Sequence, residues 1–474
     1  MINFRSSPDY DKSVQIESLQ QKRLAAAPQA SLTNKIQNIF KQNVEHIRTF
    51  FQKVAENKNC VSHYIGLRNE VFRIKKLAVP LFKKIAENFK KGAGKITENR
   101  VIRKFKDSLE FLQGCDFKFV RQSENPLQKD KLDQLEKELL EKYREYENHK
   151  KGTQSDDLIA LAIEMLRGIA KLKFRPEQYL IRNAMVAEIL TKYIVALPIP
   201  LNLEMPIPCF DANGLPTVVE YINFKCLSLG ESGLPVYIFT PQSEKDRAYY
   251  APFLIFRGTR LNLSNETDIR SIIENLNRIG PARGVYDDFK SELKRMFQSW
   301  FADQDNLPKF RILGFSQGAV LGQRAIVDFY NFIQKESLSA SILFNSPGVE
   351  ADYAIAWENM KAEVKPAVIN YLVTHDIVSK RGRKFIGEVL ELQPDEHEHS
   401  IFNAHLGAKF LEQSWVIFEV DNEKEAESYS RKLVNQVMSS GLVEGLYKLA
   451  AFSLSKLQSS GKQKQEPLKH IKLF

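Results

Sequence analysis

Residues 309–318 have the sequence KFRILGFSQG, in which a largely apolar run ends at a serine between two glycines. The run 309–313 predicts a strand, and residues 319–333 have the apolar spacing of a helix. A sharp strand-to-helix turn needs small residues on both sides of its serine, and it leaves the hydroxyl exposed at the start of the helix. Ser316 is therefore a candidate nucleophile, and the alternative is an ordinary Gly/Ser turn.

Short β-branched or aromatic runs bounded by turn residues surround this turn in the sequence. They comprise residues 217–229, 235–240, 251–256, 341–345, 368–374 and 415–420. Helical segments separate the later runs, which predicts a largely parallel sheet opened by an antiparallel hairpin. With a serine at a strand-to-helix turn, the expected class is α/β, an α/β-hydrolase fold preceded by an all-helical domain.

Upstream of residue 197 the apolar spacing is helical instead. Residues 31–54, 71–91, 156–174 and 176–197 each have one apolar face, although Pro80 must interrupt the second, and the charged stretch 131–151 predicts a solvated helix. A proline-rich stretch at 197–208 marks the expected boundary. The predicted organisation is a disordered segment 1–30, a basic helical domain 31–197, an α/β-hydrolase domain 210–455 and a basic tail 456–474.

The net charge of +10 is concentrated near the N-terminus. Residues 53–106 hold 15 basic and 4 acidic side chains. A basic patch of this kind could meet anionic lipid, nucleic acid or an acidic partner. Residues 71–91 combine apolar and lysine faces, so that an anionic membrane surface is a candidate partner of 53–106. Nucleic acid is not expected as a partner. The alternative is that this helix packs on its neighbours with its lysines outward.

The cysteines and the first residues bear on compartment and cofactors. The four cysteines, at positions 60, 115, 209 and 226, have no paired spacing, which argues against a disulfide framework and a cysteine-rich zinc site. Residues 1–9 are polar, and no long uncharged apolar run follows. We expect a cytoplasmic protein, or one exported without a cleaved signal, with peripheral membrane attachment as an alternative. We expect neither a metal nor an organic cofactor.

A nucleophilic serine needs a base and an acid, and few histidines follow it. In this fold the acid comes after the serine and before the histidine. The strand pattern 368–374 ends at Asp376, which makes this residue the candidate acid. His405 is the preferred base because it has apolar neighbours in a small-residue loop, FNAHLG, and His399 is the second candidate. His397 and His399 lie in the charged stretch 395–399, for which a solvated loop is the alternative.

Acyl transfer also needs N–H donors aimed at the developing oxyanion. One would come from Gln317, which directly follows the serine. The second should come from a loop after an earlier strand, and residues 253–256 are followed by Arg257, Gly258 and Thr259.

At this point the sequence resembles a known family. FRGT at 256–259 resembles the signature that precedes the serine elbow in class 3 (fungal-type) lipases. Four further elements follow in that family's order: Asp268, GVYDDF at 284–289, NSPGV at 345–349 and HDIV at 375–378. The resemblance covers roughly residues 215–412. It implies Ser316 as nucleophile, Asp376 as acid, His405 as base, and Thr259 and Gln317 as oxyanion-hole residues. Residues 261–279 fall where the family carries its lid; the alternative is a plain surface helix.

The elbow departs from this family at Phe315, Gln317 and Ala319, where class 3 lipases favour His, Leu and Gly. GFSQG alone resembles the elbow of acyl-protein thioesterases and related carboxylesterases, but their HG-type oxyanion strand is not found. The expected function is hydrolysis of carboxylic esters, of lipids or acyl groups, through an acyl-serine. The alternatives are a thioesterase or general carboxylesterase, and a non-catalytic hydrolase-fold module whose basic helical region binds a membrane or a partner.

Overall fold

A computed structural model describes part of the chain between residues 118 and 438. The described residues are 118–123, 128–130, 137–149, 155–229, 234–259, 274–275, 280–302, 307–394, 404–405, 410 and 415–438. They all belong to one compact unit. The predictions for residues 1–117 and 456–474, most of the lid segment 261–279, and His397 and His399 fall outside them. No helix in the described part combines the length and the apolar character that a membrane span requires.

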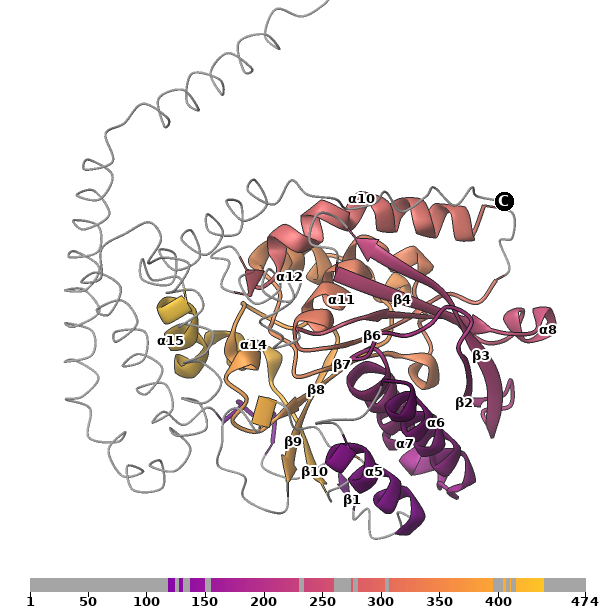
Figure 1. The fold of residues 1–474 in the computed structure, drawn as a ribbon. Helices are drawn as coiled ribbons and strands as arrows, with labels where there is room; N and C mark the ends of the chain where they lie inside the picture. The colour runs from indigo at the N-terminus through magenta and orange to yellow at the C-terminus, as the bar shows by residue number, and fades with distance from the viewer. Residues whose placement is uncertain are drawn as a thin grey trace, which may run out of the picture. The chain divides into compact units, whose positions relative to one another are not determined.

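The described strands form one mixed sheet in the order β1-β10-β9-β8-β7-β6-β5-β4-β3-β2 (Figure 1). Their bounds are β1 Gln128–Asp130, β2 Glu204–Phe210, β3 Pro216–Leu229, β4 Leu234–Pro241, β5 Phe253–Phe256, β6 Arg311–Phe315, β7 Ser341–Phe344, β8 Val368–Val373, β9 Glu388–Pro394 and β10 Trp415–Glu419. Neighbours from β5 to β9 run parallel, and the pairs outside this block are antiparallel. The expected α/β class with an antiparallel opening is therefore present.

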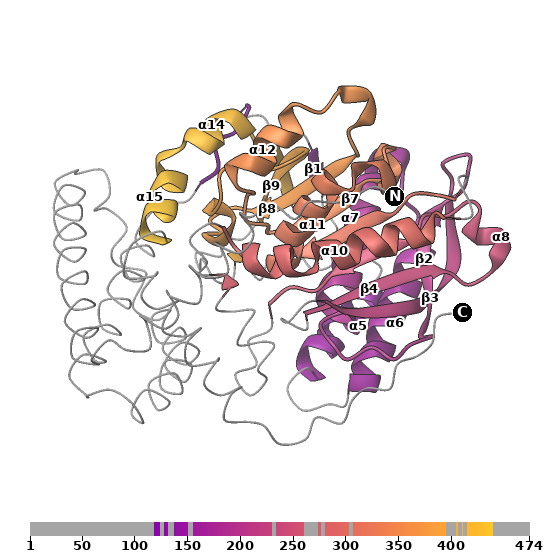
Figure 2. The same cartoon turned by 90° about the horizontal axis from the view of Figure 1, so that it is seen from above.

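Strands β5 to β9 lie side by side in chain order, so that successive strands are joined by crossovers. Helices α10 (Arg283–Trp300), α11 (Gln317–Asp328) and α12 (Ala351–Glu358) are three of these connections. Their apolar side chains share one core cluster with Leu254, Ile312 and Leu343. These crossover helices therefore cover the same face of the sheet, the upper one in Figure 1 and the nearer one in Figure 2.

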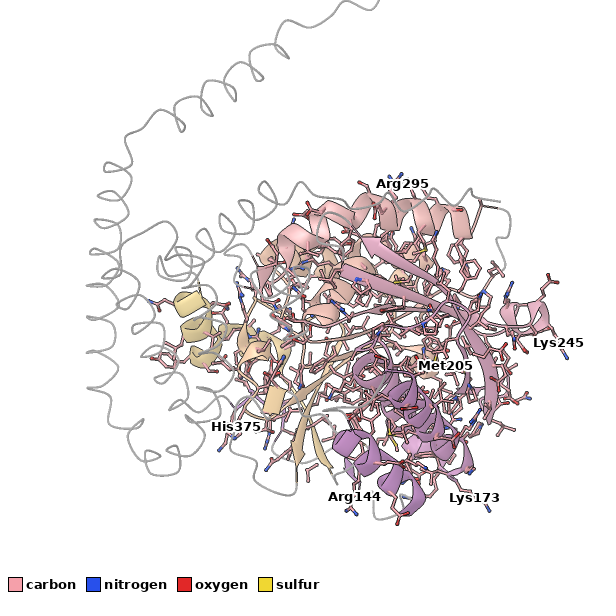
Figure 3. All side chains as sticks on the ribbon, viewed as in Figure 1. Arg144, Lys173, Met205, Lys245, Arg295 and His375 are labelled. Carbon is pink, nitrogen blue, oxygen red and sulfur yellow. The ribbon has the colours of Figure 1, made fainter. Side chains whose placement is uncertain are left out.

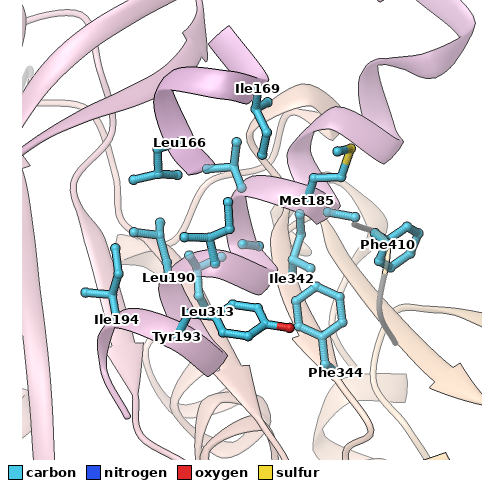
Figure 4. Packing of buried hydrophobic residues seen from close by; sticks show 14 of the residues in the cluster. Leu166, Ile169, Met185, Leu190, Tyr193, Ile194, Leu313, Ile342, Phe344 and Phe410 are labelled. Carbon is cyan, nitrogen blue, oxygen red and sulfur yellow. The ribbon is translucent and has the colours of Figure 1, made fainter. Parts of the chain in front are cut away.

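The opposite face is covered by helices that precede the sheet in the chain. They are α5 (Lys137–His149), α6 (Ser155–Lys171), α7 (Tyr179–Glu188) and the π-helical turn η3 (Ile189–Ile194). Side chains alternate between the faces of a strand, so Ile255 and Leu313 belong to a different cluster from their neighbours Leu254 and Ile312. Figure 4 shows Leu166 and Leu190 of these helices packed with Leu313 and Ile342 of the strands. A parallel sheet needs both faces covered, and these helices supply the second cover.

The boundary expected at 197–208 is therefore not a boundary of the core. Residues 204–210 form β2, which pairs with β3 at the edge of the described sheet. Pro206 and Pro208 are compatible with this position because they lack an N–H, and an edge strand leaves alternate N–H groups without a ladder partner. The helices at 137–194 share the core of the sheet, whereas the predicted helical segments before residue 118 are not described.

The last described helical segment is divided at Ser428 into α14 (Asn422–Glu427) and α15 (Tyr429–Met438). One smaller expectation also differs from the structure. The helix expected over 176–197 begins as the 3-10 turn η2 (Pro176–Gln178), continues as α7 and ends in η3. A π-helical turn widens the helix locally, and such turns are frequent at functional sites.

Candidate active site

Ser316 stands at the turn between β6 and α11, where the sequence predicts the elbow. Its φ of 56° and ψ of −120° lie outside the regions that L-residues ordinarily occupy. Its N–H donates to the carbonyl of Phe344 at 2.9 Å, which ties the turn to the end of β7. A conformation of this kind costs about 1–3 kcal/mol and persists where the surrounding structure imposes it.

The two glycines beside the serine are required by close backbone contacts. A Cβ on Gly314 would lie 2.6 Å from the carbonyl oxygen of Gly318. A Cβ on Gly318 would lie 2.1 Å from the carbonyl oxygen of Phe256, at the end of β5. Backbone cannot move aside as a flexible side chain can, so the small residues allow α11 to begin directly against the neighbouring strand.

His405 joins Ser316 to Asp376 in one line of hydrogen bonds. Its Nε2 lies 2.8 Å from the Ser316 Oγ. Its Nδ1 lies 3.0 and 3.1 Å from the two carboxylate oxygens of Asp376. Because a carboxylate only accepts, this network places the imidazole proton on Nδ1 and leaves Nε2 to accept from the serine hydroxyl. The structure thus brings the three predicted residues together, while His399, the second candidate base, is outside the described residues.

Asp376 is fully buried just beyond the end of β8. The Val378 N–H donates to its Oδ1 at 2.9 Å, and the Ser379 hydroxyl donates to its Oδ2 at 2.6 Å. Burying a carboxylate is costly unless hydrogen bonds satisfy it, and these two donors with the His405 Nδ1–H do so. His375, labelled in Figure 3, directly precedes this carboxylate and has a φ of 68°.

A buried ionic cluster holds the loop that carries Asp376. The Lys380 Nζ lies 3.0 Å from the carboxylate of Glu425 in α14 and donates to the carbonyl of Lys118 at 2.7 Å. Arg431 of α15 donates to the carbonyl of Ser379 at 2.9 Å and contacts the same Glu425 at 3.2 Å. Burial lowers the pKa of Lys380 to about 8, although the Glu425 carboxylate opposes this effect. Helices α14 and α15 therefore hold the loop that contains Asp376, through Lys380 and the backbone of Ser379.

The two predicted oxyanion-hole residues are also adjacent. Thr259 follows the end of β5, and Gln317 is the first residue of α11. The Thr259 hydroxyl donates to the Gln317 side-chain oxygen at 3.0 Å, and the Asn275 amide donates to the same hydroxyl at 2.7 Å. Backbone N–H groups in the first turn of a helix point out of its N-terminus, which suits an anion. Asn275 is one of the few described residues of the segment 261–279.

Phe315 lies beside the histidine, and two charged residues of the preceding helices contact Phe315 or the segment after the histidine. The Phe315 ring stacks on the His405 imidazole at a centroid distance of 5.5 Å. The Lys192 ammonium in η3 lies 4.8 Å from the centre of the Phe315 ring and pairs with the buried carboxylate of Glu188 at 3.4 Å. Glu188 also accepts the N–H of Phe410 at 2.8 Å, downstream of the histidine. Glu188, the last residue of α7, thus contacts the segment that follows His405.

Sequence reasoning did not find Ser379, Glu188, Asn275 or Asn345, which support the predicted residues without joining the line from serine to acid. Asn345 alone lay in a motif already noted, NSPGV. In the described part of the chain, no three His, Cys, Asp or Glu side chains are grouped closely enough to hold a metal ion.

Comparison with known proteins gives weak likenesses only. No family model matches the chain, and no curated protein is found to be similar to it. Lipase II from Rhizopus niveus is 17% identical with a TM-score of 0.26, over 36% of this chain and 64% of that one. A Rhizomucor miehei lipase propeptide complex is 15% identical with a TM-score of 0.28, over 46% and 64%. A triacylglycerol lipase from Penicillium expansum is 13% identical with a TM-score of 0.23, over 40% and 71%. The chain therefore spans less than two thirds of the first two structures, and these solved structures to which it is weakly similar are fungal lipases.

Proposed function

We propose that this chain is a serine hydrolase that cleaves carboxylic esters through an acyl-serine intermediate. The single observation that carries the proposal is the hydrogen-bond line from the Ser316 Oγ through His405 to the buried Asp376. A serine hydroxyl becomes an effective nucleophile when a base accepts its proton and a third group orients that base. The strained backbone of Ser316 supports the same conclusion, because such strain gathers at active sites.

In the first half of the reaction the Ser316 Oγ attacks the carbonyl carbon of the ester. The His405 Nε2 takes the hydroxyl proton, and Asp376 stabilises the imidazolium that forms. The backbone N–H groups of Gln317 and Thr259 stabilise the negative charge on the former carbonyl oxygen. When the tetrahedral intermediate collapses, the bond to the leaving alkoxy group breaks, and His405 delivers its proton to the departing alcohol.

The second half regenerates the enzyme. A water molecule gives a proton to the His405 Nε2 and attacks the acyl carbon bound to Ser316. The bond between the acyl carbon and Oγ then breaks, the serine recovers its proton from His405, and a carboxylic acid is released. The same sequence of steps cleaves thioesters, so the choice between lipid esters, other acyl esters and thioesters depends on the substrate pocket.

The decisive experiment is covalent labelling with a fluorophosphonate probe, with the modified residue mapped by mass spectrometry. We expect stoichiometric modification of Ser316 in the wild-type chain and none in Ser316→Ala. Hydrolysis of p-nitrophenyl esters should fall by about a thousandfold or more in the same variant, because removing the nucleophile leaves only binding and oxyanion stabilisation.

Ser337→Ala is the matched control, since Ser337 is an exposed serine in the 3-10 turn η5 (Ser337–Ser339). It should label and turn over like the wild type. A wild-type chain that never reacts with the probe, or a Ser316→Ala variant that keeps full turnover, would overturn the proposal. Parallel panels of esters of increasing acyl length and of acyl thioesters would then define the substrate class.

A further inference from the structure

Asn345 is a buried residue with an uncommon backbone conformation next to the catalytic line. It follows β7, its side chain is fully buried, and its φ is 46°. Asparagine enters the left-handed region more readily than most residues, but glycine does so with no steric cost. The backbone conformation alone therefore does not explain why this residue is an asparagine. The contacts of its side chain offer a second reason.

The side-chain amide of Asn345 uses both of its polar atoms inside the site. Its nitrogen donates to the carbonyl of Ala404 at 3.0 Å and to the carbonyl of His405 at 2.5 Å. Its oxygen accepts the N–H of Val373, the last residue of β8, at 3.2 Å. One buried side chain thus connects the backbone of the base with the strand end that leads to the acid.

Backbone hydrogen bonds tie the turn at Asn345 to strand β8 and to the serine elbow. The Asn345 N–H donates to the carbonyl of Tyr371 in β8 at 2.8 Å. The carbonyl of Phe344, the preceding residue, accepts the N–H of Ser316 at 2.9 Å. The backbone at Asn345 is therefore held by the serine elbow and by β8, the strand that precedes Asp376. Its side-chain amide binds the backbone of His405, which lies in a separate segment after β9.

We propose that Asn345 is a positioning residue, which sets the distance and orientation of His405 relative to Ser316 and Asp376. This inference rests on the proposed hydrolase function. Proton transfer from the serine requires a hydrogen bond of about 2.6–3.2 Å between nucleophile and base. A displacement of about 1 Å can lower a rate by about a hundredfold, so a backbone anchor beside the imidazole has a direct kinetic effect.

Asn345→Gly tests this role because glycine accepts the positive φ and removes only the amide. We expect the second-order rate of fluorophosphonate labelling of Ser316, and kcat/KM for an activated ester, to fall about ten- to a hundredfold. Most of the loss should be in kcat. The matched control is Asn202→Gly, which makes the same change at an exposed asparagine with a φ of 62°, and which should keep wild-type rates.

A double-mutant cycle separates positioning from general support of the fold. Mutations that act through the same group are not additive. In a His405→Ala background, Asn345→Gly should therefore change the slow residual labelling rate by less than about twofold. An equal loss with and without His405 would overturn the positioning role, and so would wild-type rates in the Asn345→Gly single variant.

Asn345→Asp provides a second variant of nearly the same shape. A carboxylate cannot donate to the carbonyls of Ala404 and His405, so labelling should fall at least as far as in the glycine variant, at a temperature where circular dichroism shows both proteins folded. Wild-type labelling in Asn345→Asp would count against the hydrogen bonds. If the wild-type chain itself never labels, the proposed function fails first, which distinguishes that result from failure of the positioning role alone.

Discussion

The serine elbow is the feature that single residues determine most directly. Ser316 could be predicted because its chemistry needs a particular local sequence: a strand, a glycine on each side, and a helix. The candidate acid followed from chain order, and the candidate base was one of the few histidines after the serine, with His405 preferred to His399 for its apolar neighbours. Ser379 and Asn345 could not be predicted, because each acts through another residue and leaves no periodic or spaced pattern. The Ser379 hydroxyl is 2.6 Å from the carboxylate of Asp376, only three residues before it, whereas Asn345 meets the carbonyl of Ala404 at 3.0 Å across 59 residues of sequence, a contact that exists only in the folded chain.

Gly318→Ala tests the close approach of α11 to β5. The added Cβ would lie 2.1 Å from the carbonyl oxygen of Phe256, so helix and strand must separate. We expect a loss of about 3 kcal/mol in the free energy of unfolding, since overpacking against backbone has no easy relief. Labelling of Ser316 should also be lost, because the shift moves Gln317 relative to Thr259. Denaturant unfolding and probe labelling measure the two effects.

Gly168→Ala is the control for this substitution. Gly168 lies inside α6, and a Cβ there would meet the Leu139 Cδ1 at 3.0 Å, the far end of a flexible side chain. Because alanine favours a helix interior by up to about 1 kcal/mol over glycine, stability should change little or rise. Equal destabilisation by the two substitutions would show that the elbow contact is not special.

Strands could be predicted where apolar side chains alternate or follow one another. A strand was missed where charged side chains interrupt the apolar run. Strand β9 was not predicted because Glu388 and Glu391 break its apolar sequence. Glu391 is nevertheless fully buried, paired with Arg121 at 2.6 Å and accepting the Thr374 hydroxyl at 3.0 Å. The partners that make this burial tolerable come from distant parts of the chain, which periodicity does not reveal.

The contact between Lys380, in the loop after Asp376, and Glu425 of α14 should make the free energy of unfolding depend on pH. Burial lowers the pKa of Lys380 to about 8, below the value of roughly 10.4 in an unfolded chain. Between these values the unfolded state binds more protons, so the contribution of Lys380 to the free energy of unfolding rises with pH. Lys380→Met cannot titrate, and subtracting its stability from that of the wild type isolates this contribution.

We expect this difference to move in favour of the wild type by about 2 kcal/mol from about pH 7.5 to about pH 9.5, measured by denaturant unfolding. Lys245→Met, at an exposed lysine of α8 (Glu244–Arg247) labelled in Figure 3, is the control and should show no such trend. A difference that is flat or falls with pH would mean that Lys380 keeps its proton throughout this range.

For the whole molecule, periodicity identified helices at 156–197 but not what they pack against. A helical spacing shows that one face is apolar, and the same face could belong to a separate bundle or to the cover of a sheet. The crossover helices α10, α11 and α12 occupy one face, so the second face required a cover from elsewhere in the chain. Helices α6 and α7 supply it, and Glu188 at the end of α7 reaches the segment beyond His405.

The uneven charge of the chain leads to a prediction about its partner surface. Residues 1–200 hold 37 basic and 24 acidic side chains, a difference of +13, whereas the remaining residues hold 31 and 34, a difference of −3. If the basic stretch 53–106 meets an anionic membrane, the full chain should float with vesicles containing phosphatidylserine and not with phosphatidylcholine vesicles. Each lysine or arginine near such a surface contributes about 1 kcal/mol, so the attraction is collective.

The attraction should weaken as ionic strength rises, because salt screens exposed charges beyond about 10 Å at 0.1 M. A variant in which Lys75, Lys76, Lys83 and Lys84 are changed to glutamine should bind clearly less. The matched control changes four basic residues of the second half and should bind like the wild type. They are Lys290, Lys294 and Arg295 of α10, and Lys335 just before η5. Ser316 labelling serves in both variants as the measure of an intact fold. Absence of flotation in low salt, or equal loss in the two variants, would exclude residues 53–106 as a membrane-binding surface and leave their charge for another acidic partner.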